Sequence, residues 1–88
     1  MAKRDKLLER MRTNPRDWSI QDIETLCNGF EINCEAPKRG SHYGVGDSTQ
    51  TAILTVPFDR PIKQAYIKRL VAFVDAVQTA RENAKEGK

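Results

Sequence analysis

The chain has 88 residues, of which 39% are hydrophobic and 31% are charged. This balance is ordinary for a globular domain and excludes the low hydrophobicity and single-sign charge of disordered chains. No apolar run approaches the roughly 18 residues that a membrane span needs, and the segment MAKRDKLLERM is charged where a signal peptide is apolar. We therefore expect a single cytoplasmic domain over residues 1–88 that does not contact a membrane.

The net charge of +3 is unevenly distributed along the chain. Residues 1–16 hold six basic and two acidic side chains, whereas residues 17–36 hold five acidic and no basic ones. Such separation fits one face for a nucleic acid and another face for a different partner, with ordinary solvated charge as the alternative.

Two short helices are expected in the first third of the chain. RDKLLERM places its three apolar residues on one helical face, and Pro15 stops this first helix. Ser19 is a suitable N-cap with Asp22 three residues later, close to a capping box, and Gly29 supplies a C-terminal stop. The second helix is therefore expected over residues 20–28.

The hydrophobic period then changes to two, which indicates strands. A first strand is predicted over residues 30–35. SHYGVG predicts a second strand over residues 41–46 that sends Tyr43 and Val45 to the core and His42 to the open face. QTAILTV, rich in β-branched residues and ended by a proline, predicts a third strand, so the three form an antiparallel meander with one covered face.

A long helix is expected to cover the sheet. Pro61 suits its first position behind Asp59 or Arg60, and an apolar stripe of about 20 residues follows. Residues 78–88 lose their apolar members and are expected to fray as a charged tail. The fold class predicted is α+β, a two-layer sandwich. Its α-β-β-β-α core, residues 19–77, has the order of double-stranded-RNA-binding domains, and residues 1–18 add an N-terminal helix.

The single histidine, His42, is the best candidate for a reactive group. Gly40 and Gly44 remove side chains beside it and leave room for a ligand near the backbone. Lys38 and Arg39 supply cations that hold a phosphate.

These are the parts that metal-free RNA cleavage requires. An imidazole takes the proton of a ribose 2′-hydroxyl at neutral pH, and cations with the N–H groups around Gly40 and Ser41 stabilise the charged phosphorane. DNA lacks this hydroxyl, so the chemistry is selective for RNA. If the hairpin pairs Glu35 opposite His42, the carboxylate would orient the ring and raise its pKa, with a solvated Glu35 as the alternative.

Rival chemistries fit the sequence less well. A metal nuclease needs converging carboxylates or histidines, whereas the acidic residues are spread along a helix face and a strand edge. Cys27 and Cys34 are expected to be reduced core residues, because two ligands do not make a zinc site and the helical position of Cys27 is apolar. We expect no metal and no cofactor.

Four segments in order resemble the HicA family of bacterial toxins: a helix ending in NGF, then KRGSH, TVP and PIKQAYIKRLV. The similarity covers residues 20–77, and its most specific part is Gly40-Ser41-His42 followed by Val56-Pro57 and Ile62-Lys63. HicA proteins are small ribonucleases with a double-stranded-RNA-binding-like fold, neutralised by HicB antitoxins encoded beside them. The resemblance thus implies an mRNA interferase of a toxin-antitoxin stress-response system, with mRNA and a HicB-like antitoxin as partners.

By the same resemblance, His42 is the catalytic general acid or base, Gly40 and Ser41 shape its loop, and Lys63 contacts RNA. Many members place a second histidine where this chain has Phe58, so a general acid is missing there. The alternative is a non-catalytic RNA- or protein-binding module of the same fold.

The segment before Trp18 is an addition to the family pattern. It would extend RNA binding, contact the antitoxin or pack on the domain. We favour packing, because Leu7, Leu8 and Met11 need burial.

Overall fold

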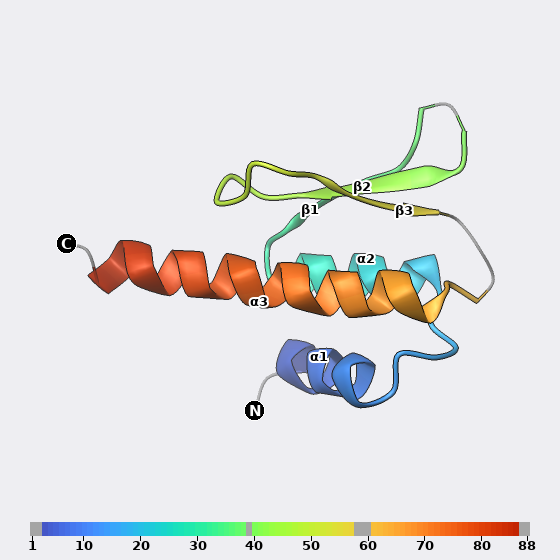
Figure 1. Ribbon diagram of the computed structural model, residues 1–88, viewed down its shortest axis with the longest axis horizontal. Helices are drawn as coiled ribbons and strands as arrows, with labels where there is room; N and C mark the ends of the chain where they lie inside the picture. Colours follow the sequence, from blue (N-terminus) through green and yellow to red (C-terminus); the bar gives the residue numbers. More distant parts are fainter. Residues whose placement is uncertain (1–2, 39, 58–60, 87–88) are drawn as a thin grey trace.

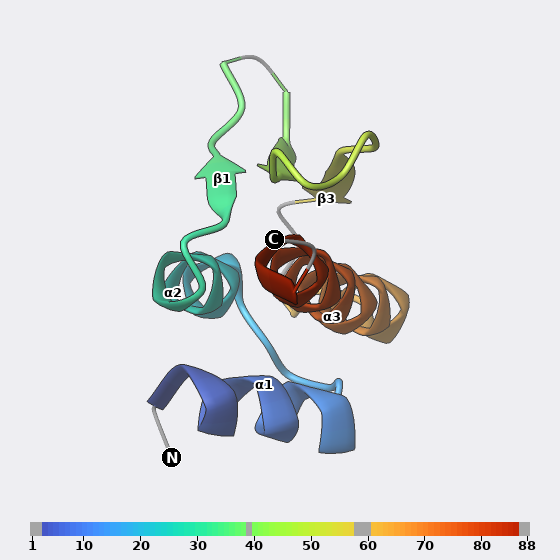
Figure 2. The same ribbon diagram turned by 90° about the vertical axis from the view of Figure 1, so that its left-hand side faces the viewer.

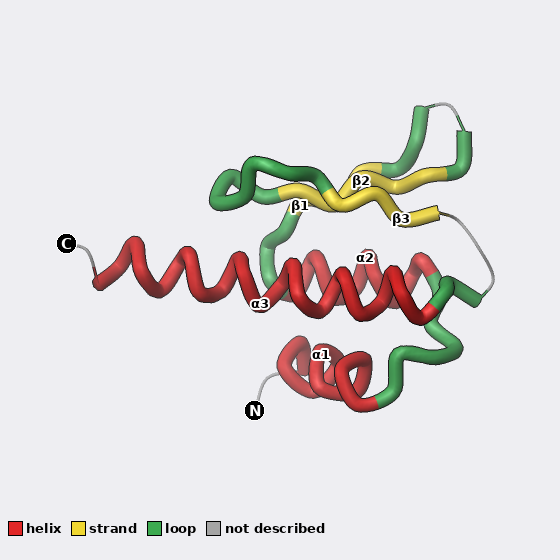
Figure 3. The backbone as a smooth tube through the Cα atoms, in the orientation of Figure 1, coloured by secondary structure: helices red, strands yellow, loops and turns green. Residues whose placement is uncertain are grey.

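The computed structural model describes residues 3–38, 40–57 and 61–86, which form three helices and a three-stranded antiparallel sheet. The elements in chain order are α1 (Lys3–Thr13), α2 (Ile20–Gly29), β1 (Asn33–Glu35), β2 (His42–Gly46), β3 (Leu54–Pro57) and α3 (Gln64–Glu86). The sheet order is β1-β2-β3, with β2 in the centre, as a meander requires. The predicted α+β class and the predicted order of elements are confirmed (Figures 1 and 3).

The elements are stacked in layers. Figure 2 shows the sheet above α2 and α3, which lie side by side, and α1 on the opposite side of these two helices. The core is apolar and draws on all six elements or their flanks, and no polar or charged residue among those described is buried in it. Within the described residues, none of the helices has both the length and the apolar character required to cross a membrane.

The N-terminal helix packs on the domain. Leu8 and Met11 are buried, and Leu7 is partly buried against the same core, so α1 uses its apolar face as expected. Helix α2 begins with the predicted capping box, in which the Ser19 side chain accepts a hydrogen bond from the backbone N–H of Asp22 and the Asp22 carboxylate accepts one from Ser19 N at 2.9 Å. This arrangement satisfies donors that the first turn of a helix leaves free.

The first strand is shorter than predicted. It begins at Asn33, because Phe30 and Glu31 form a turn in which Glu31 has φ 56° and Ile32 N donates to Cys27 O at 2.8 Å. Phe30 and Ile32 are nevertheless buried. The apolar alternation at these two positions therefore reflects burial within the turn and its exit, and the prediction of a strand over residues 30–32 is wrong.

The boundaries of the long helix also differ from the prediction. Helix α3 begins at Gln64, so Pro61 precedes it, and Ile62 instead pairs with Trp18 in an isolated antiparallel bridge. The proposed caps Asp59 and Arg60 lie outside the described residues. The helix continues to Glu86, so residues 78–86 are helical where a charged, frayed tail was expected, and residues 87–88 lie outside the described residues.

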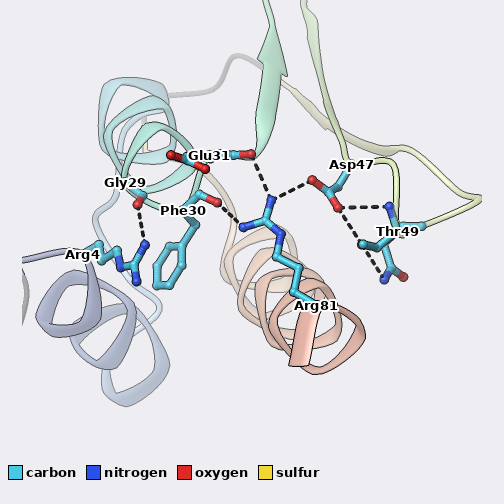
Figure 4. Close-up of polar contacts among 8 residues, drawn as sticks. Arg4, Gly29, Phe30, Glu31, Asp47, Thr49 and Arg81 are labelled. Atoms are coloured by element: carbon cyan, nitrogen blue, oxygen red, sulfur yellow. Dashed lines mark hydrogen bonds and ion pairs between the residues drawn. The ribbon is translucent and has the colours of Figure 1, made fainter. Parts of the chain in front are cut away.

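The continuation of α3 is explained by one side chain. Arg81 donates to the carbonyl oxygens of Phe30 at 2.5 Å and Glu31 at 3.0 Å, and it forms an ion pair with Asp47 at 2.9 Å (Figure 4). Hydrogen bonds from Thr49, followed by that from Arg81, hold the pKa of Asp47 below its ordinary value. Arg81 thereby joins α3 to the α2–β1 turn and to the β2–β3 loop.

Removing this three-way contact should destabilise the fold. We expect Arg81→Gln to lower the free energy of unfolding by about 1–2 kcal/mol, because charge-assisted hydrogen bonds to partly exposed groups contribute on that order. Urea denaturation followed by circular dichroism measures the change, with the exposed Lys68→Gln on the same helix as the control. An unchanged urea midpoint for Arg81→Gln would contradict this role.

A second arginine joins α1 to α3. Two nitrogens of the Arg12 guanidinium contact the two carboxylate oxygens of Asp75, each at 2.8 Å. The hydrogen bonds from Arg12 hold the pKa of Asp75 below its ordinary value. Both side chains are exposed to solvent, so the ion pair contributes little to stability. Its main effect is to fix the orientation of α1 on α3.

The Asp75 pair should make stability depend on acid pH. A carboxyl whose pKa is lowered by folding stabilises the protein fully above its unfolded pKa, near 3.8, and loses that contribution as the pH falls through the lower folded value. We therefore expect Asp75→Asn to be less stable than the wild type by under about 1 kcal/mol at neutral pH. The difference should begin to shrink as the pH falls below 3.8 and should vanish below the lower folded pKa of Asp75. Thermal denaturation of both proteins across this range tests it, and a constant difference at all pH values would be the opposing result.

Candidate functional site

The loop between β1 and β2 turns at a glycine. Gly40 has φ 83°, in the left-handed region that disfavours residues with a Cβ atom. A Cβ placed on Gly40 would meet no atom within 4 Å. The glycine is therefore required for the backbone conformation and not for space, and it fixes how the exposed Ser41 and His42 enter strand β2.

His42 is the first residue of β2 and is exposed. Along this strand Val45 is fully buried and Tyr43 is partly buried against the core. Because successive side chains of a strand point to opposite faces, His42 and Gly44 lie on the face turned away from the helices. The predicted placement of His42 on the open face is confirmed.

Glu35 does not lie opposite His42. The register pairs Glu35 with Gly44 and His42 with Pro57 of β3, and the Glu35 carboxylate accepts a hydrogen bond from Asn33 Nδ2 at 3.1 Å. The conditional pairing of Glu35 with His42 is thus ruled out by two residues, and Glu35 is exposed, as in the alternative of a solvated side chain. Alternation permits either register, since a shift of two residues keeps every side chain on the same face.

Ile53 covers the glycines of the open face. It is 68% exposed, and Cβ atoms built on Gly44 and Gly46 would each lie 3.6 Å from its side chain. The room expected beside Gly44 is therefore partly occupied. The sequence held a signal for this placement, because Ile53 is out of phase with the core-facing Leu54 and Val56.

The cationic candidates lie on separate segments. Lys38 is exposed in the β1–β2 loop, Lys63 is exposed directly before α3, and Arg39 lies outside the described residues. Figure 1 shows the loop before β2, the end of β3, the α1–α2 loop and the start of α3 at the same end of the molecule, on the right of the view. The segments that carry Lys38, His42 and Lys63 are thus gathered at one end.

No described residue shares a hydrogen bond or an ion pair with the side chains of Lys38, His42 or Lys63. The imidazole of His42 consequently has no described acid or base beside it, and Phe58, where a second histidine was sought, lies outside the described residues. No three His, Cys, Asp or Glu side chains in the described part of the chain lie close enough together to hold a metal ion.

The cysteines are placed for packing. Cys27 is fully buried, as expected, and Cys34 is partly buried against the core. A hydrogen bond with Cys34, together with burial, raises the pKa of the Cys27 thiol well above its ordinary value. Since the thiolate is the nucleophilic form, Cys27 is unsuited to nucleophilic catalysis.

Comparison of the chain with models of protein families, with curated proteins and with solved structures finds no match. The functional argument therefore depends on the chain's own geometry. Its centre is an exposed imidazole that follows a left-handed glycine on the uncovered face of the sheet.

The two glycines beside His42 should respond differently to substitution. Gly40→Ala forces a Cβ into the left-handed region, so we expect it to lower the free energy of unfolding by about 1–2 kcal/mol. Gly44→Ala is the matched control, because its Cβ would make ordinary contact with Ile53 at 3.6 Å. Chemical denaturation of both variants distinguishes them, and equal effects would show that the conformation of Gly40 is not restrictive.

Proposed function

We propose that this protein is a HicA-like toxin, a metal-independent endoribonuclease that cleaves mRNA with His42 as general acid or base. The observation that carries the proposal is the exposed imidazole at the start of β2, which directly follows the Gly40-Ser41 turn and has no partner among the described residues. An imidazole in this position is accessible to a strand of RNA, and imidazole is the side chain most often used for proton transfer in catalysis.

The proposed reaction uses the RNA's own 2′-hydroxyl. His42 accepts the proton of this hydroxyl, whose oxygen forms a bond to the adjacent phosphorus. The bond from phosphorus to the 5′-oxygen of the next nucleotide breaks, and that oxygen takes a proton from the imidazolium or from water. The products are a 2′,3′-cyclic phosphate and a free 5′-hydroxyl.

Charge on the phosphorane is stabilised by the loop that precedes His42. Lys38 and, by sequence, Arg39 supply cations, and the backbone N–H groups around Gly40 and Ser41 supply hydrogen-bond donors. No second side chain acts as proton donor in this scheme, because no described side chain is paired with His42, so the imidazolium itself or water protonates the leaving oxygen.

The arrangement of elements supports the same assignment. The order α2-β1-β2-β3-α3 is that of double-stranded-RNA-binding domains, with α1 added beneath the two helices. We assign the domain to this fold type on its element order and on the family-like motifs that it displays.

A HicB-like antitoxin is the proposed protein partner. It would cover the open face of the sheet, contact Ile53 through apolar groups and present acidic side chains to Lys38 and Lys63. Both mRNA and the antitoxin would be met in the cytoplasm.

The decisive test is His42→Ala. We expect expression of the wild type to arrest growth and the purified protein to cleave RNA in the presence of a metal chelator. His42→Ala should lose about 10²–10⁴-fold in cleavage rate, the usual effect of removing a general acid or base, and should permit growth. Thr55→Ala, on the same open face opposite Gly44, is the matched control and should retain activity.

Equal toxicity of the wild type and His42→Ala would contradict the proposal. Wild-type protein that binds RNA with strong salt dependence but leaves it intact would favour the second candidate, a non-catalytic RNA-binding module. The absence of a described acid or base beside His42 is the observation that favours this candidate.

A further inference from the structure

The arginines of this protein are mostly engaged in structural contacts. Of the six arginines that the structure describes, five have an ion pair, a side-chain hydrogen bond or an aromatic ring as partner. These five are Arg4, Arg10, Arg12, Arg69 and Arg81. The guanidinium of Arg16 has no such partner among the described residues and is exposed, so packing and ion pairing do not explain it.

The backbone that carries Arg16 is held in place by Trp18. The Trp18 indole N–H donates to Asn14 O at 2.6 Å, and the guanidinium of Arg10 stacks 5.4 Å from the ring centre. Ile62 N donates to Trp18 O at 2.9 Å. The α1–α2 loop is thus held internally by the hydrogen bond between Trp18 and Asn14. The hydrogen bond between Ile62 and Trp18 holds it against the segment that leads into α3.

The antiparallel bridge between Trp18 and Ile62 brings two unpaired cations together. In an antiparallel pair, residues that precede Trp18 lie beside residues that follow Ile62, so residues 16–17 run alongside residues 63–64. Arg16 and Lys63 line one open surface pocket of about 490 Å³, together with Asp17, Pro61, Ile62 and Gln64. This volume lies in the range of pockets that accept small organic groups.

The chemistry of this pocket favours an anion. Its side chains carry two positive charges and one negative charge, and the planar guanidinium of Arg16 presents paired donors that match two phosphate oxygens. The two segments that line the pocket, residues 16–17 and 61–64, lie at the end of the molecule where β2 begins (Figure 1). An RNA strand that passes His42 therefore has a cationic pocket on its path.

We propose that Arg16 and Lys63 form a seat for a backbone phosphate of the RNA, away from the bond that is cleaved. This inference rests on the proposed function, and it gives the segment before α2 a role in RNA binding besides packing. Arg16 binds the phosphate as a bidentate hydrogen-bond donor, and Lys63 adds a second positive charge. The negative charge of Asp17 lowers the affinity of the seat for the phosphate. Because phosphates carry no sequence information, the seat positions the RNA without selecting its bases.

The experiment measures binding without cleavage. All variants are made in the His42→Ala background, and the dissociation constant for a fluorescein-labelled single-stranded RNA is measured by anisotropy over a series of KCl concentrations. Arg16→Gln and Lys63→Gln should each weaken binding about three- to tenfold. Because both side chains contact the same phosphate, the double variant should reduce the slope of log K against log [KCl] by about 0.7, the value for one lost phosphate contact on a single strand, and each single variant should reduce it by less.

Two matched variants sharpen the test. Lys6→Gln removes the same charge from an exposed, unpaired position of α1, and it should change the affinity and the slope less than either seat variant. Asp17→Asn keeps a residue type that tolerates the observed φ of 64° and should tighten binding. Equal thermal midpoints establish that each variant is folded.

The outcomes separate this proposal from the proposed activity. Wild-type cleavage of RNA with unchanged binding by Arg16→Gln and Lys63→Gln would overturn the seat and leave the ribonuclease in place. Effects of Arg16→Gln and Lys63→Gln no larger than that of Lys6→Gln would also overturn it, because they would reflect net charge alone. A third outcome is that Arg16→Gln and Lys63→Gln lower the affinity and the salt slope while the wild type does not cleave RNA. This outcome would support the seat and refute the catalytic role of His42.

Discussion

Helix α3 buries apolar side chains toward the sheet, toward α2 and toward α1, and the other elements assemble on this surface. Ile67, Leu70, Val74 and Val77 are fully inaccessible, and both α1 and β3 contact the helix that carries them. A domain of this size hides only roughly 60–65% of the surface that its unfolded chain exposes, so a single central helix supplies much of the available core. Helix α3 also stabilises the fold outside the core, because its Arg81 donates hydrogen bonds to two carbonyl oxygens of the α2–β1 turn.

One consequence is a division of the sheet into two faces with different constraints. The face toward α2 and α3 must remain apolar, as Val45 and Val56 show. The other face carries His42, two glycines and Ile53 and is not required for packing. Chemistry placed there can change without cost to the core, which is the usual relation between a fold and the site that it displays.

The sequence predicted the features that depend on periodicity and capping. The placement of His42 opposite to Val45 follows from a period of two, and the start of α2 follows from Ser19 and Asp22. It could not predict the register of β1 and β2, because alternation is blind to a shift of two residues. The end of α3 was also beyond local patterns, since it depends on contacts of Arg81 with residues far away in the sequence.

The pocket shows a further limit of local patterns. In the sequence Arg16 is one of the six basic residues of segment 1–16, and only the pairing of Trp18 with Ile62 brings it beside Lys63. Phe58 stands where the family resemblance places a second histidine. That prediction stays a prediction, because residue 58 lies outside the described part of the chain.

The bridge between Trp18 and Ile62 also bears on biosynthesis. Its two residues are separated along the chain by α2 and the entire sheet, so closing it carries the loop-closure entropy of a long-range contact. During translation the hairpin with His42 leaves the ribosome before α3, the helix on which it packs. The core that holds His42 is therefore completed only after α3 has been synthesised, and the backbone pairing that brings Arg16 beside Lys63 requires the chain through residue 63.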